Sequence, residues 1–269
     1  MERLRRRISE LLSEAQVRSR TQELEQELLD ACQFAGIVGG SALMLDVFAK
    51  LRRIAPHFRT VIVTGPTGTG KELVARAVHR LSPVGSGPFA VCNCSAIVGT
   101  LVESELFGYV RGAFTGATQD KIGVFEYGNR GTVLLDEIGE VSLTAQSKLL
   151  RVLQSQEIQR IGSPIPRVID IRVIAATNRN LRSMVKEGKF REDLYYRRAM
   201  VEIPLTRLTD RREDLPLLER HWLERFAAEY KKPGITRRAQ TRMAIYSWPV
   251  NIRELENVIG NACMMVMEK

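Results

Sequence analysis

A glycine-rich loop at residues 65–71 joins an apolar run at residues 60–64 to a helical pattern that begins at Glu72. The loop reads Gly-Pro-Thr-Gly-Thr-Gly-Lys. Its glycines let the backbone turn N–H groups towards a phosphate, and the start of the following helix adds positive charge. A strand, a G-x-x-x-x-G-K loop and a helix in this order predict a nucleotide-phosphate site within an α/β fold. The residues predicted to bind the nucleotide are Gly65, Thr67, Gly68, Thr69, Gly70 and Lys71.

Short β-rich runs alternate with helical patterns, at residues 60–64, 89–93, 132–136, 169–175 and 200–204. This alternation predicts a five-stranded parallel sheet with helices on both faces. After Pro204 the strands stop, and helices are expected at residues 214–230, 236–247 and 252–267. We therefore predict an α/β nucleotide-binding subdomain at residues 34–205 and a helical subdomain at residues 206–269.

Residues 1–33 follow a different pattern from the rest of the chain. Their apolar side chains have heptad-like spacing in two registers, first Leu4, Ile8, Leu11 and Ala15, then Val17, Leu24, Leu28 and Ala31. The change of register near Ala15 predicts a coiled-coil-like helix with a hinge or stutter. Such a helix either lies on its own domain or acts as a dimerising, signal-transmitting linker, and the pattern favours neither.

Composition and charge narrow the class of protein. With 44% hydrophobic and 26% charged residues, the chain is typical of a globular protein and not of a disordered one. No run approaches the roughly 18 apolar residues of a membrane span, and residues 1–7 lack the apolar core of a signal peptide. We therefore expect a cytoplasmic protein with no membrane partner. The net charge of +9 favours a polyanion partner, and no basic arm concentrates it as a DNA-reading element would.

Cysteines and histidines suggest little chemistry of their own. Without a secretion signal, the cysteines are expected to be free thiols: Cys32, Cys92, Cys94 and Cys263. Cys92 and Cys94 flank Asn93 as neighbours on one strand face, and no His or Cys nearby completes a metal site. Structural roles are expected for the widely separated histidines, His57, His79 and His221.

The apolar run at residues 132–136 ends in two adjacent carboxylates, Asp136 and Glu137. At the end of a strand beside the phosphate loop, Asp136 is predicted to hold Mg²⁺ and Glu137 to polarise a water for attack on ATP. Glu72 stands where Ser or Thr usually supplies a hydroxyl to Mg²⁺, so metal binding is expected to rest on the other acids. Glu137 argues against a nucleotide-binding scaffold that does not hydrolyse.

Residues 112–117 read Gly-Ala-Phe-Thr-Gly-Ala and form a second glycine-flanked loop, here named the signature loop. An aromatic side chain between flexible glycines favours a contact role over packing as a buried plug. Together with the phosphate loop and the acids, this loop resembles the AAA+ ATPase domain of bacterial enhancer-binding proteins, which activate sigma-54 RNA polymerase. The resemblance runs from about residue 36 to the C-terminus and implies an AAA+ P-loop NTPase with a helical lid. It implies sigma-54 contact through Gly112, Ala113, Phe114, Thr115, Gly116 and Ala117.

The resemblance also implies roles around the nucleotide. Glu72 is usual in the family and joins the nucleotide-binding set. Asn93 matches a switch residue that holds Glu137 away from water. Asn178, which follows Thr177, matches the first sensor. Arg253 matches the second sensor, which faces the γ-phosphate from the lid.

Arg191 and Arg197 match the family's arginine fingers, which a neighbouring subunit supplies to neutralise transition-state charge. Without the resemblance, a surface ion pair of Arg191 with Glu192 or Asp193 would be the expectation. A shared site implies a homo-oligomer, a hexameric or heptameric ring when active. A resting dimer held by residues 1–33 is a further hypothesis.

By resemblance, the cofactors are ATP and Mg²⁺ and the partner is sigma-54 RNA polymerase. DNA contact is expected only through a module absent from this chain, which is expected to be the centre of a longer, signal-regulated protein such as a two-component response regulator. Another AAA+ remodeller, a helicase loader or an unfolding chaperone, would share the ATP site and differ in the signature loop. Departures from the family lie at Pro66-Thr67, at Tyr109-Val110 and at Val250, and predict altered packing of the signature loop's leading arm and a tighter lid turn.

Overall fold

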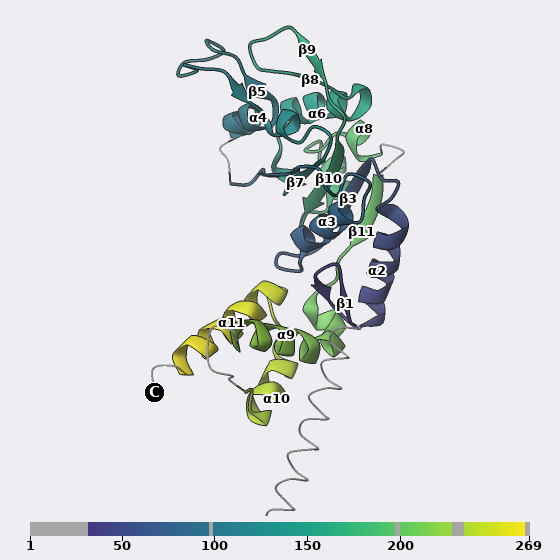
Figure 1. The fold of residues 1–269 in the computed structure, drawn as a ribbon, viewed down its shortest axis with the longest axis vertical. Helices are drawn as coiled ribbons and strands as arrows, with labels where there is room; N and C mark the ends of the chain where they lie inside the picture. The colour runs from purple at the N-terminus through teal and green to yellow at the C-terminus, as the bar shows by residue number, and fades with distance from the viewer. Residues whose placement is uncertain (1–31, 97–98, 197–199, 228–233, 267–269) are drawn as a thin grey trace, which may run out of the picture.

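The computed structural model describes residues 32–96, 99–196, 200–227 and 234–266. A five-stranded parallel sheet lies at its centre, in the order β11-β3-β10-β7-β4 (Figure 1). The strands are β3 (Thr60–Thr64), β4 (Phe89–Asn93), β7 (Thr132–Asp136), β10 (Arg172–Thr177) and β11 (Met200–Pro204). The predicted fold class is confirmed for this part of the chain. The predicted linker helix falls almost wholly on residues 1–31, outside the described residues.

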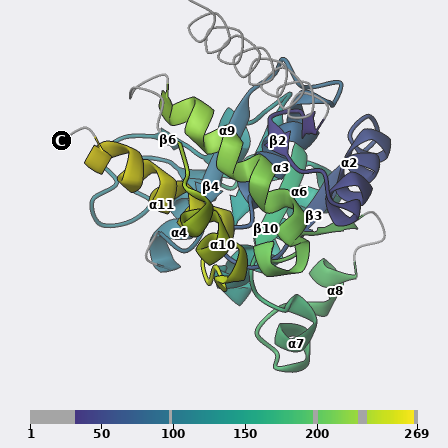
Figure 2. The ribbon, with the colours of Figure 1, turned by 90° about the horizontal axis from the view of Figure 1, so that it is seen from below.

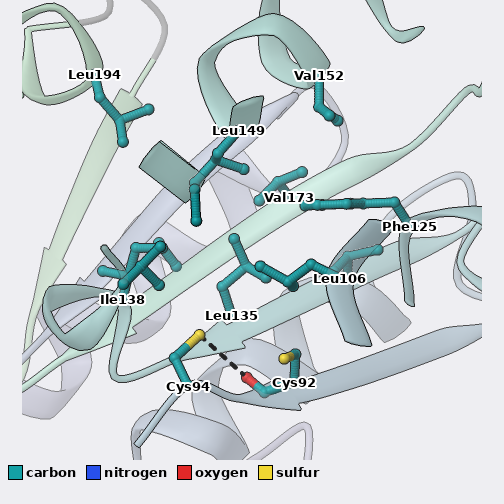
Figure 3. Close-up of a cluster of buried hydrophobic side chains, with 14 of the residues drawn as sticks. Cys92, Cys94, Leu106, Phe125, Leu135, Ile138, Leu149, Val152, Val173 and Leu194 are labelled. Atoms are coloured by element: carbon teal, nitrogen blue, oxygen red, sulfur yellow. Dashed lines mark hydrogen bonds between the residues drawn. The ribbon is translucent and has the colours of Figure 1, made fainter. Parts of the chain in front are cut away.

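Alternate side chains of each central strand enter two different cores. In β7, Val133 and Leu135 pack on one face of the sheet, and Leu134 packs on the other. Figure 3 shows the first core, where Leu135 and Val173 meet Leu149 of an overlying helix. Burial of each such side chain stabilises the fold by about 1.5–3 kcal/mol. The sheet is therefore covered on both faces, as a parallel sheet requires.

Helices cover the two faces of the sheet. One face packs against α2 (Ala42–Ile54) and α3 (Lys71–Arg80). The other face packs against α4 (Gly99–Phe107), α5 (Val124–Tyr127), α6 (Leu143–Ser155), α7 (Leu181–Lys186) and α8 (Glu192–Tyr195). Ser41 and Ser142 cap α2 and α6, since each side chain accepts a backbone N–H of the first turn.

The fourth strand begins at Arg172 and not at Ile169 as predicted. The backbone N–H of Ile169 donates to Gln156, and the carbonyl of Asp170 accepts from Arg130. These two residues are therefore bonded to loops outside the sheet. At its other end the strand continues to Thr177, which lies opposite Thr64 of β3.

Three short antiparallel pairs were not predicted. They are β1 (Gln33–Phe34) with β2 (Ile37–Val38), β5 (Gly108–Tyr109) with β6 (Lys121–Ile122), and β8 (Glu157–Gln159) with β9 (Pro166–Val168). The pairs β5–β6 and β8–β9 lie together at the upper end of the molecule in Figure 1. Runs of two or three residues are too short to give a readable alternation in the sequence.

The C-terminal helices form a lid with a core of its own. They are α9 (Leu215–Ala227), α10 (Arg237–Ile245) and α11 (Asn251–Val266), preceded by the 3₁₀ segment η2 (Leu208–Asp214), with the short 3₁₀ turn η1 (Ile138–Glu140) in the body. Trp222 and Trp248 are buried in this core with Leu255. Figure 2 shows α9 and α11 lying close together. α10 ends at Ile245, before its predicted limit at residue 247, and Tyr246 adopts an extended conformation.

The cysteines are unpaired, and His79 has a structural partner. All four cysteines are free thiols, as predicted. His79 is buried and its Nδ1 lies 2.9 Å from Thr132 Oγ1, which is a structural role. Burial lowers the pKa of His79. Within the described residues, no helix combines the length and apolarity needed to cross a bilayer.

Candidate functional site

The predicted nucleotide residues meet at the carboxyl edge of the sheet. The phosphate loop follows β3, Asp136 ends β7, and Thr177 ends β10. Since β10 pairs with both β3 and β7, these three strand ends are adjacent. The backbone of Gly65 donates to the carbonyl of Thr177 at 3.2 Å, which joins the loop to β10. Ligands bind at this edge in open α/β sheets.

Lys71 lies at the centre of the phosphate loop and is buried. Its ammonium donates to the carbonyl oxygens of Gly65 and Pro66 at 3.0 and 3.3 Å. It also lies 3.6 Å from Glu137 Oε1. The loop is therefore a compact ring of backbone around one cation, with α3 starting at the lysine itself.

Glu137 is held in a left-handed backbone conformation at φ +53° directly after β7. One carboxylate oxygen faces Lys71, and the other accepts the backbone N–H of Asn178 at 3.0 Å. A left-handed conformation costs a non-glycine residue about 1–2 kcal/mol, so the surrounding contacts must maintain it. This geometry aims the carboxylate at the centre of the site.

Asp136 provides the second carboxylate. Burial, the nearby Glu137 and, to a smaller extent, Glu72 raise its pKa, while Lys71 opposes the rise. A carboxylate whose charge is disfavoured by burial and by like charges is a suitable partner for a divalent cation. The donor set therefore fits Mg²⁺ with Asp136 as the protein ligand.

Two predicted residues have other partners in this structure. The carboxylate of Glu72 accepts from Nε and Nη2 of Arg76 at 2.9 and 2.7 Å, in an exposed i,i+4 pair. The amide oxygen of Asn93 accepts from the backbone and the hydroxyl of Ser95 at 3.0 and 2.8 Å. Asn93 lies opposite Asp136 in the sheet.

Asn178 is bonded both to Glu137 and to the phosphate loop. Its backbone holds Glu137, and its side-chain amide donates to Thr67 Oγ1 at 3.0 Å. A cavity of ≈ 700 Å³ opens beside these residues, lined among others by Gly65, Pro66, Arg179 and Tyr196. The first-sensor candidate therefore links the phosphate loop to the predicted catalytic acid.

The lid contacts the phosphate loop directly. The backbone N–H groups of Ile252 and Arg253, in the first turn of α11, donate to the carbonyl of Gly68 at 3.0 and 3.3 Å. Asn251 donates from Nδ2 to the carbonyl of Thr67 at 2.9 Å and accepts the N–H of Leu208. The structure thus places Arg253, the second-sensor candidate, against the loop.

A buried ion pair joins the loop, the lid and the start of α2. Side chains of Arg211 and Asp214 are 1% and 0% exposed, and Nη1 lies 3.7 Å from Oδ2. Arg211 Nη2 donates to the carbonyl of Thr69 at 3.3 Å. The Asp214 carboxylate accepts the N–H groups of Gly40 and Ser41, each at 2.7 Å. Burial lowers the pKa of Arg211, and Asp214 opposes the shift.

The arginine-finger candidate Arg191 lies at the start of α8 with polar partners of its own. Arg191 forms a two-bond ion pair with Asp193 at 3.0 and 2.7 Å, and its Nη1 donates to Ser147 Oγ at 3.1 Å. Asp193 raises the pKa of the exposed Arg191. Arg197 lies outside the described residues.

The signature loop lies at the end of the body away from the lid (Figure 1). Phe114 is 41% exposed there, so it is not a fully buried plug. The loop's own bonds run from Gly112 N–H to the Ala117 carbonyl at 2.9 Å and from Ala117 N–H to the Phe114 carbonyl at 3.0 Å. The chain thus carries an interlocked phosphate site near its lid and an exposed loop at the opposite end.

Comparison with protein families decides the assignment. The family model described as the sigma-54 interaction domain matches residues 37–204, and the one described as the AAA+ ATPase lid domain matches residues 209–269. The chain belongs to the sigma-54 activator family of AAA+ ATPases. Within this family, the phosphate loop, the acids and the signature loop fall in the interaction domain, and Arg253 falls in the lid.

Individual relatives of this sigma-54 activator domain agree. Regulatory protein AtoC of Escherichia coli K12 is 48% identical over 244 residues, which cover 90% of this chain and 53% of AtoC. The DNA-binding transcriptional regulator NtrC of Azospirillum brasilense is 46% identical over 224 residues, or 83% and 47% of the two chains. The crystal structure of Brucella abortus NtrX in complex with ATP has a TM-score of 0.79 at 34% identity, over 93% and 57% of the two chains. The chain spans about half the length of these relatives.

Sequence reasoning missed the residues that hold the lid to the ATP site of this activator domain. Asn251 lies between Val250 and Arg253 and was assigned no role, although its left-handed φ of +57° is a conformation that asparagine favours. Arg211 and Asp214 lie in a run of charges that is usual on a solvated surface, so no sequence signal marked them as buried.

Proposed function

We propose that this domain hydrolyses ATP and uses the signature loop to remodel closed complexes of sigma-54 RNA polymerase. The observation that carries the proposal is the presence, in one member of this family, of an interlocked phosphate site and a separate exposed loop with Phe114 at its tip. A site that binds and hydrolyses nucleotide without such a loop would have no evident means of engaging a partner.

In the proposed reaction, a water attacks the γ-phosphorus, the bond to the bridging oxygen breaks, and Glu137 accepts the water's proton. Lys71 and Arg253 neutralise phosphate charge, and Asn178 holds Glu137 in place. Asp136 would hold Mg²⁺, which when bound would supply positive charge to offset that of the phosphates. The positions of Lys71, Asp136, Glu137 and Asn178 at the carboxyl edge of the sheet support these roles, and the contact of Arg253 with the phosphate loop supports its own.

Arg191 and Arg197 are proposed to act on the ATP of a neighbouring subunit in a hexameric or heptameric ring. Arg191 would exchange Asp193 for phosphate oxygens on assembly. The prediction is that Glu137→Gln and Arg191→Ala proteins are each inactive alone and regain turnover when mixed, because some interfaces then combine an intact Glu137 with an intact Arg191. Phosphate release at fixed total protein measures it. A mixture no more active than its components would contradict a shared site.

The wider setting is also a proposal. We place the subdomain limits at residues 34–205 and 206–269, with residues 1–33 as the linker that sets any resting dimer. DNA would be contacted through a module outside this chain, and the activity would take place in the cytoplasm beside RNA polymerase.

Thr115→Ala tests the loop's role separately from the ATP site. The variant is expected to keep wild-type ATP turnover, because the signature loop lies away from the phosphate loop. It is expected to lose capture of purified sigma-54 in the presence of a transition-state ATP analogue. Wild-type protein that hydrolyses ATP but captures no sigma-54 would favour another AAA+ remodeller, and wild-type protein without phosphate release would favour a scaffold.

A further inference from the structure

The side chain of Phe114 is held by an aromatic neighbour outside the signature loop. The rings of Tyr109 and Phe114 meet edge to face, with centroids 4.9 Å apart and planes at 66°. This is a favoured geometry for two aromatic rings. The exposed tip residue of the loop therefore has a defined resting position.

Tyr109 is a rigid support, in contrast to the loop it contacts. Its backbone lies opposite Lys121 in the β5–β6 pair and forms a bridge with Ile161, which follows β8. The carbonyl of Gly108 also accepts the N–H of Ile161 at 2.9 Å. Two neighbouring segments thus fix Tyr109, while Phe114 lies beyond the glycine that opens the loop.

A second contact, between Ala113 and Gly162, holds the loop's backbone and does not involve the Phe114 ring. A Cβ atom placed on Gly162 would lie 2.8 Å from the Cβ of Ala113, so the loop packs closely on the turn between β8 and β9. At the base, Asp120 accepts the N–H of Arg111 at 2.8 Å, and Arg160 lies 3.5 Å from the same carboxylate. These contacts hold backbone and base, and the ring contact holds the aromatic tip.

We infer that Tyr109 is a positioning residue that holds the Phe114 ring in its resting position. The loop must break this ring contact before Phe114 can engage a partner. The inference rests on the proposed function for its consequence on sigma-54, though not for the contact itself. An aromatic pair of this kind biases a two-state equilibrium by roughly 2- to 10-fold. Tyr109 therefore sets how readily the tip is presented, without touching the nucleotide.

Fluorescence of a tryptophan at position 114 tests directly whether residue 109 holds the aromatic tip. Both native tryptophans are buried, Trp222 at 6% and Trp248 at 4% exposure, so a Phe114→Trp protein carries one exposed reporter against a shielded background. Acrylamide quenching is compared for four proteins. One carries Phe114→Trp alone, and the other three carry it together with Tyr109→Phe, Tyr109→Ala or Tyr109→Leu. The aromatic Tyr109→Phe should leave quenching unchanged, whereas Tyr109→Ala and Tyr109→Leu should each raise it about twofold or more. Equal quenching in all four proteins would overturn the inference.

The consequence for the partner is measured in the native loop. Tyr109→Leu keeps an apolar side chain at the site and should retain the wild-type ATPase rate, while capturing sigma-54 with ADP roughly 2- to 10-fold better than wild type. Tyr109→Phe should match wild type. If quenching rises while capture with ADP is unchanged, the contact between Tyr109 and Phe114 does not limit binding of sigma-54, and the inference fails at that step. If the wild type captures no sigma-54 with any nucleotide but quenching rises on Tyr109→Ala and Tyr109→Leu, the proposed function fails. The role of Tyr109 in holding the ring at position 114 is then still supported.

Discussion

Each of the two glycine-flanked loops of this protein contains a glycine with a similar left-handed φ, and the surroundings of these glycines differ. Gly68 in the phosphate loop has φ +78°, and Gly112 in the signature loop has φ +81°. A Cβ atom on Gly68 would lie 1.9 Å from the carbonyl oxygen of Val250 in the lid, whereas a Cβ atom on Gly112 meets nothing within 4 Å. Glycine is therefore required by space in the first loop and by backbone conformation alone in the second.

This difference separates a site that is assembled from several elements from a loop with open space beside its first glycine. The phosphate loop is held by β10, by the lid turn at Val250 and by Arg211. The signature loop is held at its base and by one face of its tip, and the rest of it is open. The closest of the contacts around the phosphate loop is that of Gly68 with Val250, a residue that departs from the family pattern.

The broadest expected effect comes from Gly68→Ala, which should impair both nucleotide binding and turnover. Its methyl group would collide with the Val250 carbonyl, so the lid turn and the loop could not both keep their positions. We expect nucleotide affinity and turnover both to fall by about 100-fold or more, since a steric conflict of this size costs several kcal/mol. Isothermal titration with ATP and phosphate release measure the two effects.

Gly112→Ala is the matched control, because the conformational cost is the same and the space is free. It should lose about 1–2 kcal/mol of local loop stability and leave ATP binding unchanged. If Gly68→Ala bound ATP as well as Gly112→Ala, the lid contact would not define the site.

Glu137→Gln should have a more selective effect. The amide has the shape of the carboxylate and can still accept from Asn178, so ATP affinity should change by less than about twofold. Turnover should fall by about 10²- to 10⁴-fold because the amide cannot take up the water's proton. Single-turnover hydrolysis with ATP bound in advance checks this, and unchanged hydrolysis would remove Glu137 from its role.

The smallest effect concerns the lid and depends on pH. Glu219 on α9 is 5% exposed, and burial raises its pKa to about 7 from an ordinary 4.5. The folded state binds this proton more tightly than the unfolded state, so its stabilisation is complete below pH 4.5 and is lost as pH rises to about 7. The loss is at most about 3 kcal/mol.

Glu219→Gln should therefore raise the Tm at pH 8 by a few degrees more than at pH 5. Glu224→Gln on the exposed side of the same helix is the control. The same Tm difference for Glu219→Gln at both pH values would show that burial of this carboxyl carries no cost.

The α/β body could be predicted because its signals are local. Each strand is a run of apolar residues between turns, and the phosphate loop joins a strand to a helix. Strand limits were less certain where an apolar residue packs without joining the sheet, as Ile169 does. The short pairs around the signature loop depend on contacts between distant segments, such as Tyr109 with Ile161, which no local pattern encodes.

The candidate site divides in the same way. Lys71, Asp136 and Glu137 are predictable because motif and strand end place them at one edge. The partner of Asn93 is not, since Ser95 bonds its amide oxygen at short range. The ion pair of Arg191 with Asp193 is one of the two that the sequence alone offered, because the two residues are neighbours in the chain. The burial of Arg211 depends on how the lid packs on the body, which follows from tertiary contacts alone.

Open-complex formation by sigma-54 RNA polymerase tests most directly whether ATP hydrolysis at one loop drives work at the other. Turnover and promoter opening are measured in the same sample for the wild type and for Thr115→Ala, with ATP and with a non-hydrolysable analogue. Promoter opening is expected only for the wild type with ATP, while Thr115→Ala should hydrolyse ATP at the wild-type rate and open no promoter. Promoter opening by Thr115→Ala at the wild-type rate, or by the wild type with the analogue, would contradict it.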